Sequence, residues 1–468
     1  MTREELKKLI NEIEEPDRAM MEKAAARQAE LAKPPGSLGR LEDISVKIAG
    51  ITGELAPNVT RQAIAVMSAD NGVWEEGVAC APQSVTRAQT INFTRRLTGV
   101  GALSKNFGVD LLVTDVGVLD PIPDELYTDR PEVAVGAAAE CATGSVAAIG
   151  KAELTEKGVL AGTGARAGIG VQAGDKVAAG TGARTEIGAR AGKIWNRKIR
   201  PATNNIYKEA AMTEEEALLA IETGIEAART LKKLGYGMIG VGEMGIGNTT
   251  TSTCLLAEFT GVPAAQIVGK GGGLSSDGYE RKKAVVSGAC ERAERELGDR
   301  REDPIAVLAE LGGFDIAAMA GAYIGAAACR LPVVIDGYIS VVAALTADRI
   351  FDYYRVTSDV AGQSGCLDAA AQAVRAGQPG KPAGPTFRLA DFMFASHKSF
   401  ERGYEVAVEA LGLEPMLLLG MRLGEGSGCP IAFKVIESAV AVMRDMATFE
   451  EAAINDDYLD EIRLGDSF

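Results

Sequence analysis

Gly237-Met-Ile-Gly-Val-Gly-Glu-Met-Gly-Ile-Gly-Asn-Thr-Thr250 starts as an apolar run, passes through a glycine-rich turn and leads into a stretch with helical character. Similar apolar runs, rich in β-branched residues, occur at Ala63–Met67, Val109–Val113 and Pro332–Ile335. Long amphipathic stretches lie between them, such as Thr213–Leu234, which opens with a capping box. Nearly continuous apolar strands that alternate with helices are typical of a parallel sheet covered on both faces. The sequence therefore predicts an α/β fold with a Rossmann-like parallel sheet covered by helices.

Each of these four runs leads to an acidic residue beside a glycine, namely Asp70, Asp115, Glu243 or Asp336. In open α/β sheets, ligands bind beyond the carboxyl ends of the strands, where glycines let the backbone approach them. We therefore expect several carboxylates around one mouth of the sheet. The alternative is that Asp and Gly simply favour turns and helix caps.

The 468-residue chain carries 49 Lys and Arg against 64 Asp and Glu, a formal net charge of −15, and 47% of its residues are hydrophobic. This length and composition predict two or three folding units with packed cores. The acidic balance argues against a protein that binds nucleic acid or an anionic membrane, but it allows a local site for an anionic small molecule.

Seven cysteines are scattered without a Cys-x-x-Cys pair, which is typical of reduced thiols in a cytoplasmic protein. The charged N-terminus argues against an export signal. The longest apolar stretch, Ala317–Ala347, is interrupted by Arg330 and Asp336, so we expect buried core there rather than a membrane span. His397 is the only histidine, which excludes a metal site built from several histidines.

The segment 125–192 departs from this pattern because it is rich in glycine and alanine. Ala161-Gly-Thr-Gly-Ala-Arg166 recurs as Ala179-Gly-Thr-Gly-Ala-Arg184, and further Ala-Gly pairs give a six-residue period. Hexads can build a β-solenoid. A flexible insertion or an extended hairpin explains the same composition at least as well.

The turn after the first quoted strand is a candidate anion site. Gly240–Gly245 matches the Gly-x-Gly-x-x-Gly dinucleotide fingerprint, but the acidic residue expected about 20 positions later is not convincing. A safer interpretation is a turn that directs backbone N–H groups and the Thr249 and Thr250 hydroxyls to an anion at a helix N-terminus. Glu243 would suit a cationic ring or a ribose hydroxyl better than a phosphate.

Two further glycine-rich stretches contain candidate binding or catalytic residues. Gly269–Leu274, followed by Lys282 and Lys283, could cradle a phosphate, and a flexible loop with solvated lysines is the alternative. Met421–Gly428 places Glu425 between glycines before an apolar helix. Partial burial there would raise the pKa of Glu425 towards the range of a general base, whereas a surface turn is the structural alternative.

Seven motifs follow one another along the chain: Lys33-Pro-Pro-Gly-Ser-Leu-Gly-Arg-Leu-Glu42, Ala69-Asp-Asn-Gly-Val-Trp-Glu-Glu-Gly77, Gly242-Glu-Met-Gly-Ile-Gly-Asn-Thr-Thr250, Gly312-Gly-Phe-Asp315, Asp336-Gly-Tyr-Ile-Ser340, Ser396-His-Lys-Ser399 and Arg422-Leu-Gly-Glu-Gly-Ser-Gly428. In type and order they resemble the signatures of the nicotinate-nucleotide–dimethylbenzimidazole phosphoribosyltransferase family. The resemblance covers nearly the whole chain except 125–192 and the stretch from about 351 to 389.

The resemblance implies a phosphoribosyl transfer in the nucleotide-loop branch of cobamide synthesis. A lower-ligand base such as 5,6-dimethylbenzimidazole attacks C1′ of nicotinate mononucleotide, nicotinate leaves, and α-ribazole 5′-phosphate forms. It also implies no metal, no cofactor, and a homodimer with active sites near the interface. The domains expected are an α/β large domain from 61–124 and 193–390, interrupted by the insertion 125–192, and a smaller helical domain to which 1–60 and 391–468 contribute.

Site residues follow from the same motifs, residue by residue. Glu425 matches the general base that takes the N–H proton of the benzimidazole, and Glu243 matches the glutamate beside the nucleotide. Gln89 falls at a base-pocket glutamine, and Lys282 falls near a phosphate-side lysine, with Lys283 one residue away. Substrate-binding roles are also implied for Asp70, Gly245, Asn248, Thr249, Gly271, Asp336, Ser340, Leu423 and Gly424.

Two positions depart from the family pattern: Asn71 stands where many members have histidine, and Ala81 replaces a base-pocket serine. Adenine, another benzimidazole or a phenolic base are therefore alternative acceptors. A non-catalytic partner subunit is a further alternative, and an NAD-dependent oxidoreductase rests on the glycine fingerprint alone. For His397 and Trp74, a structural role and a role in the site are both open.

Overall fold

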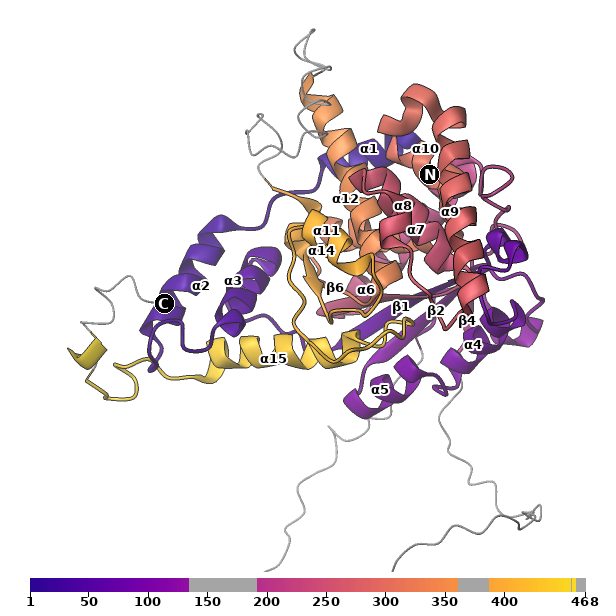
Figure 1. Cartoon of the computed structure of the whole chain (residues 1–468). Helices are drawn as coiled ribbons and strands as arrows, with labels where there is room; N and C mark the ends of the chain where they lie inside the picture. The colour runs from indigo at the N-terminus through magenta and orange to yellow at the C-terminus, as the bar shows by residue number, and fades with distance from the viewer. Residues whose placement is uncertain (134–191, 361–386, 456, 460–468) are drawn as a thin grey trace, which may run out of the picture. The chain divides into compact units, whose positions relative to one another are not determined.

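The computed structural model describes residues 1–133, 192–360, 387–455 and 457–459, which belong to one compact unit. Its centre is a parallel sheet with the strand order β3-β4-β2-β1-β5-β6-β7 (Figure 1). The strands are β1 (Gln62–Ala69), β2 (Asp110–Gly117), β3 (Tyr127–Thr128), β4 (Ile194–Asn196), β5 (Met238–Met244), β6 (Val333–Ile335) and β7 (Met393–Ala395).

The four strands that the sequence predicts are β2, β1, β5 and β6, which are neighbours in the sheet. Every residue of these strands is buried, as expected when helices cover both faces. The sequence does not predict the strands β3, β4 and β7, which are two or three residues long. They form where a neighbouring strand offers backbone partners.

Helices cover the two faces of the sheet (Figure 1). On one face lie α4 (Ser84–Thr94), α5 (Gly99–Phe107) and α15 (Cys429–Asp445). On the other face lie α6 (Glu214–Lys233), α11 (Phe314–Ala328) and α12 (Tyr338–Val360). The predicted capping box of α6, formed by Thr213 and Glu216, is present. An α/β fold with a parallel sheet is thus confirmed.

The remaining helices pack outside this arrangement or near the chain ends. They are α1 (Arg3–Asn11), α2 (Arg18–Glu30), α3 (Arg40–Thr52), α7 (Asn248–Thr260), α8 (Ala264–Ile267), α9 (Ser276–Leu297), α10 (Pro304–Leu311) and α14 (Tyr404–Ala410). Short 3₁₀ turns occur at η1 (Gly72–Glu76), η2 (Asp124–Leu126), η4 (Gly298–Glu302), η5 (Leu389–Phe392) and η6 (Asp457–Leu459).

The helices α6 and α11 approach each other closely because each presents a glycine to the other's backbone. A Cβ at Gly224 would overlap the carbonyl oxygen of Ala318, and a Cβ at Gly321 would overlap that of Ile221. The segment Ala317–Ala347 is buried along nearly its whole length, as predicted. No helix among the described residues is long and apolar enough to cross a membrane.

Segments from the two chain ends pack together in a small helical cluster. The helices α2 and α3 meet the end of α15 around Ala24, Ala49 and Met443 (Figure 1). Leu31 also forms a backbone bridge with Thr448. The small domain expected from both chain ends, like the other domain boundaries, stays a prediction.

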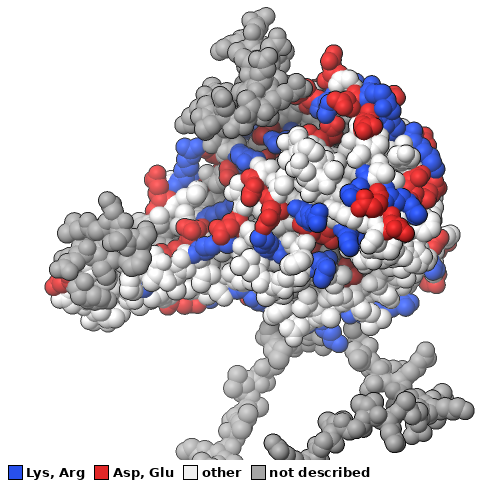
Figure 2. Space-filling model, viewed as in Figure 1, with Lys and Arg blue, Asp and Glu red and all other residues white. Residues whose placement is uncertain are grey.

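The glycine- and alanine-rich segment begins inside the sheet, because its residues Tyr127–Thr128 form β3 and pair with β4. The repeats at 161–166 and 179–184 lie outside the described residues. On the face shown in Figure 2, basic and acidic side chains are interspersed, so the basic groups there have acidic neighbours.

Candidate active site

A cavity of about 270 Å³ lies at the carboxyl ends of β5 and β6. Its wall comes from α4, the turn from β5 into α7, the loop before α9, the start of α12 and the loops on either side of α14. Nine of the thirteen predicted site residues line it: Gln89, Glu243, Gly245, Asn248, Thr249, Gly271, Leu423, Gly424 and Glu425. Segments that are far apart in the sequence therefore converge on one cavity.

Glu425 sits in a strained loop just before α15. Its φ of +68° lies in the left-handed region, which is costly for a residue with a side chain. The glycines on either side have packing reasons: a Cβ at Gly424 would overlap the Glu243 carboxylate, and Gly426 has a φ of +90°. The glycine pattern thus reflects close contact within the site rather than a surface turn.

The carboxylate of Glu425 lies at the N-terminus of α5. Its Oε2 accepts a hydrogen bond from the backbone N–H of Val100 at 3.2 Å, and its Oε1 accepts one from Gln89 Nε2 at 3.3 Å. Burial raises the pKa of Glu425, while the Val100 and Gly99 N–H groups and Gln89 oppose that rise. This carboxylate is therefore held in place and has a raised affinity for a proton.

Glu243, at the end of β5, forms a second acidic centre with Asp315, near the start of α11. The side-chain amide of Asn248 donates a hydrogen bond to both carboxylates, and its bond to Asp315 Oδ2 measures 2.9 Å. Burial, together with the charge of Asp315, raises the pKa of Glu243 to about 8. Burial also raises the pKa of Asp315 to about 6. The pair therefore favours retention of a proton near neutral pH.

Lys282, on α9, is fully buried at the edge of the cavity. Its Nζ donates to Thr249 Oγ1 at 2.7 Å, close to the turn at Gly271. Burial lowers the pKa of Lys282 to about 8, because the charged form loses its hydration. Lys283 instead pairs with Glu280 on the outer side of the same helix, at 2.7 Å. Of the two lysines, Lys282 is thus the one beside the cavity.

Asp336 and Ser340 do not line the cavity but support its wall. The Asp336 carboxylate accepts the backbone N–H groups of Gly426 at 2.8 Å and Gly428 at 2.7 Å. Burial raises the pKa of Asp336 to about 7. Ser340 Oγ donates to the carbonyl of Val241 at 3.0 Å and so ties the start of α12 to β5.

The expectation of a ring of strand-end carboxylates is confirmed only in part. Of the four predicted carboxylates, Glu243 alone lines the cavity. Asp70 Oδ2 accepts the N–H of Leu119 at 2.8 Å, which holds the loop after β2. Asp115 accepts the N–H groups of Gly117 and Val118 in the same region.

Several lining residues were not singled out from the sequence. Ser399 and Arg422 lie within recognised motifs, whereas Val85 and Glu401 carried no signal that distinguishes them from other helix or loop residues. Asp315 also belongs to a motif, but its contact with Asn248 links positions 67 residues apart.

The positions that depart from the family pattern are not part of the cavity lining. Neither Asn71 nor Ala81 lines the cavity, and neither does Trp74. The Ala81 carbonyl accepts the Trp74 indole N–H at 2.9 Å, which fixes this turn. Two glycines of the dinucleotide fingerprint, Gly240 and Gly242, lie inside β5, where α15 and the loop before it leave no room for a side chain.

Comparison with known proteins supports the family resemblance over nearly the whole chain. The family model described as "Phosphoribosyltransferase" matches residues 13–363 and 385–454. A nicotinate-nucleotide–dimethylbenzimidazole phosphoribosyltransferase of Clostridium perfringens is 41% identical over 458 residues, which covers 98% of each chain. The protein of the same name from Ruminiclostridium cellulolyticum is 39% identical over 445 residues, covering 95% of this chain and 96% of that one.

Among solved structures, the crystal structure of CobT from Thermus thermophilus matches with a TM-score of 0.68 and 29% identity. The match covers 94% of this chain and 99% of that chain. The chain belongs to the nicotinate-nucleotide–dimethylbenzimidazole phosphoribosyltransferase family.

Proposed function

We propose that this protein transfers the phosphoribosyl group of nicotinate mononucleotide to a lower-ligand base such as 5,6-dimethylbenzimidazole. The products are nicotinate and α-ribazole 5′-phosphate. The observation that carries the proposal is the convergence of Glu425 and Glu243 on one cavity in a member of this family. The loop that carries Glu425 also lies against the Glu243 carboxylate, because a Cβ at Gly424 would overlap Glu243 Oε1.

Glu425 acts as the general base in this proposal. One nitrogen of the benzimidazole attacks C1′ while the N–H of its other nitrogen loses a proton to the carboxylate. The raised pKa of Glu425 strengthens its affinity for that proton, and Gln89 and the N–H of Val100 fix its orientation. A positioned base of this kind contributes roughly 10²–10⁴-fold to the rate.

Glu243 would face the part of the substrate that carries positive charge. The nicotinate ring is a pyridinium in the nucleotide, and the ribosyl carbon gains positive character as the bond to nitrogen breaks. A nearby cation favours the ionised form of a carboxylate, so substrate binding would lower the pKa of Glu243 from about 8. Positioning of the two substrates supplies much of the remaining acceleration.

The 5′-phosphate would lie against Lys282, Thr249 and Gly271. No carboxylate comes within 4 Å of Lys282 Nζ among the described residues, so this buried cation lacks a direct ion-pair partner. A phosphate would supply that partner and also reach the N-terminus of α7. In this proposal the phosphate lies at one side of the cavity, and the attacking base lies towards Glu425.

We further propose a cytoplasmic homodimer with the interface near the site. Residues 398–400 run beside 417–421 through backbone hydrogen bonds. This region presents Phe400, Leu418, Leu419 and Leu423, each of which is at least half exposed, and Leu423 also lines the cavity. Apolar side chains gathered in this way are typical of a surface that another protein chain covers.

The transfer is tested by incubating the protein with nicotinate mononucleotide and 5,6-dimethylbenzimidazole and following both products by chromatography. Nicotinate and α-ribazole 5′-phosphate should appear in equal amounts, and Glu425→Gln should lose roughly 10²-fold or more in rate. Glu405→Gln is the matched control, because Glu405 pairs with Lys398 on the surface. Parallel reactions with adenine and a phenol identify the acceptor class.

Two results would contradict the proposal in different ways. Absence of products with all acceptors, despite binding of nicotinate mononucleotide, would indicate a non-catalytic subunit. Equal turnover by Glu425→Gln and wild type would remove Glu425 from the role of base while leaving the transferase activity in place.

A further inference from the structure

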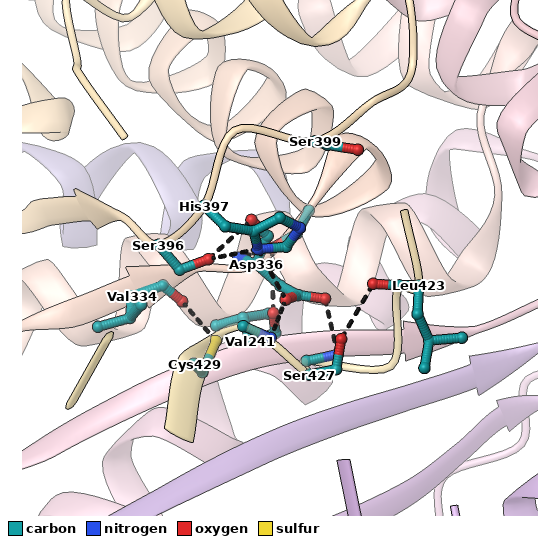
Figure 3. Close-up of polar contacts among 12 residues, drawn as sticks. Val241, Val334, Asp336, Ser396, His397, Ser399, Leu423, Ser427 and Cys429 are labelled. Atoms are coloured by element: carbon teal, nitrogen blue, oxygen red, sulfur yellow. Dashed lines mark hydrogen bonds and ion pairs between the residues drawn. The ribbon is translucent and has the colours of Figure 1, made fainter. Parts of the chain in front are cut away.

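His397 is a buried histidine in which one ring nitrogen lacks a hydrogen-bond partner among the described residues. It follows β7 and has no solvent exposure. Its Nδ1 lies 3.1 Å from Ser396 Oγ and 3.8 Å from Asp336 Oδ1 (Figure 3). Its Nε2 is also buried but has no hydrogen-bond partner among the described residues. A buried polar atom without a partner costs free energy, so it calls for a ligand or a solvent molecule that completes it.

The surrounding hydrogen bonds determine which nitrogen carries the proton. Ser396 Oγ donates its single proton to the backbone carbonyl of Asp336, at 3.0 Å. It can therefore only accept in its contact with His397, which makes Nδ1 the donor. Burial lowers the pKa of His397 to about 4, so the ring is neutral at neutral pH. The unpartnered Nε2 is consequently a bare hydrogen-bond acceptor.

Gly337, a residue of the cavity wall, lies next to this acceptor. Gly337 lines the cavity, and its φ does not lie in the left-handed region. A Cβ at Gly337 would lie 3.7 Å from His397 Nε2 and 3.9 Å from Ser399 Oγ, which are ordinary contact distances. Neither backbone conformation nor crowding within the chain therefore requires glycine here. A side chain at this position would point at these two polar atoms, and glycine leaves that position vacant.

The group that fills this space must donate a hydrogen bond to His397. At neutral pH, neither the nicotinate carboxylate nor a fully ionised phosphate carries a proton to donate. The N–H of the attacking base is already assigned to Glu425. The donors that remain on the proposed substrates are the two ribose hydroxyls of the nucleotide.

We infer that His397 Nε2 and the Ser399 hydroxyl together bind one ribose hydroxyl of the nucleotide in the space beside Gly337. His397 is thus a positioning residue that orients the ribose by a hydrogen bond, and it does not exchange protons during the reaction. This inference rests on the proposed function for the identity of the substrate. Its consequence is discrimination between ribose and deoxyribose at one hydroxyl.

The test measures binding of nicotinate mononucleotide by calorimetry, so that it does not depend on turnover. His397→Asn keeps a donor for Ser396 but removes the acceptor at the Nε2 position, and we expect roughly 10-fold weaker binding. His397→Gln restores an acceptor near that position and should recover most of the affinity. Gly337→Ala fits the chain but fills the space, so it should also weaken binding.

Deoxy analogues identify the contact. Against wild type, either the 2′-deoxy or the 3′-deoxy analogue should bind roughly 10-fold more weakly than the parent nucleotide. The affinity for that analogue should not fall further in the variant His397→Asn. Tyr404→Phe is the control, because it also removes a buried polar atom that has no hydrogen-bond partner among the described residues.

The inference would be overturned if His397→Asn bound all three nucleotides as wild type does. It would also be overturned if the variant weakened all of them by the same factor, as expected for a structural role or a bound water. Failure of the proposed function would show differently, since wild type would then release no nicotinate, whatever the variants of His397 bind.

Discussion

The carboxylate of Asp336 accepts the backbone N–H of Gly426 at 2.8 Å, which ties the end of β6 to the loop that carries Glu425. The same carboxylate accepts the N–H of Gly428 at 2.7 Å. Glu425 has a positive φ, so its conformation must be stabilised by contacts around it. A side chain that does not line the cavity thus sets the position of the proposed base.

Asp336→Asn should lower kcat by roughly 10-fold or more, with a smaller change in the KM for nicotinate mononucleotide. The amide can accept one of the two N–H groups but presents its own N–H to the other, which costs on the order of 1–3 kcal/mol. Asp391→Asn is the matched control, because Asp391 also accepts a backbone N–H, from Arg388 at 2.9 Å, and does not line the cavity. An unchanged kcat in Asp336→Asn would show that the loop holds its position without this carboxylate.

Substitutions of the two neighbouring lysines of α9 should have different effects on the KM for nicotinate mononucleotide. Lys282→Met should raise the KM for nicotinate mononucleotide by roughly 10²-fold, because it removes a charge-assisted contact to the phosphate while preserving the buried stem. Lys283→Met should leave steady-state kinetics unchanged, because Lys283 lies against Glu280. Nicotinate riboside, which lacks the phosphate, should be used equally by wild type and Lys282→Met. Discrimination between the riboside and the nucleotide that persisted in Lys282→Met would place the phosphate elsewhere.

The sequence predicts the central fold because its main strands have their own apolar pattern, as in Ala63–Met67 and Gly237–Val241. It also predicts that Glu425 and Glu243 belong to one site, through the family motifs. It does not distinguish lining residues from supporting ones. Asp336 and Ser340 belong to a motif yet hold the wall from behind, and that distinction depends on hydrogen bonds between segments about 90 residues or more apart.

Glu243→Gln should stabilise the protein at pH 8 and have little effect at pH 4.5. Burial and Asp315 raise the pKa of Glu243 to about 8, so the folded state binds a proton more tightly than the unfolded chain does. The contribution of this bound proton to the free energy of unfolding is fully present below the ordinary glutamate pKa. It is lost as pH rises through about 8. Because one pKa unit corresponds to about 1.4 kcal/mol, the loss amounts to a few kcal/mol.

Thermal unfolding from pH 4.5 to 8.5 measures this effect. The melting temperature of wild type should fall relative to that of Glu243→Gln as the pH rises, with a difference of several degrees at pH 8. Glu437→Gln, at a partly exposed site beside Lys434, controls for the loss of a carboxylate at the surface. Parallel curves for wild type and Glu243→Gln would mean that Glu243 titrates near its ordinary pKa.

The apolar surface formed by Phe400, Leu418, Leu419 and Leu423 should control assembly. Leu418→Asp places a charge on this surface at a side chain that is 78% exposed, so the fold should be preserved. We expect light scattering to show a shift from dimer to monomer for this variant, together with reduced activity that depends on protein concentration. Leu219→Asp, at an exposed position on α6, should leave the oligomeric state unchanged. A wild-type monomer that is fully active would exclude the dimer.

Gln89→Leu should move the acidic limb of the pH–rate profile to higher pH. Gln89 Nε2 donates to Glu425 Oε1 at 3.3 Å, and this hydrogen bond opposes the effect of burial on the pKa of Glu425. Without it, the ionised form loses a partner, so the pKa of Glu425 rises further and activity is lost at a higher pH as the solution is acidified. The profile of kcat/KM for the base, measured with saturating nucleotide, reports this shift. If Gln89 only contacts the lower-ligand base, kcat/KM would fall equally at every pH, and the acidic limb of the profile would stay in place. A shifted limb would therefore identify Glu425 as the titrating base through the residue that holds it.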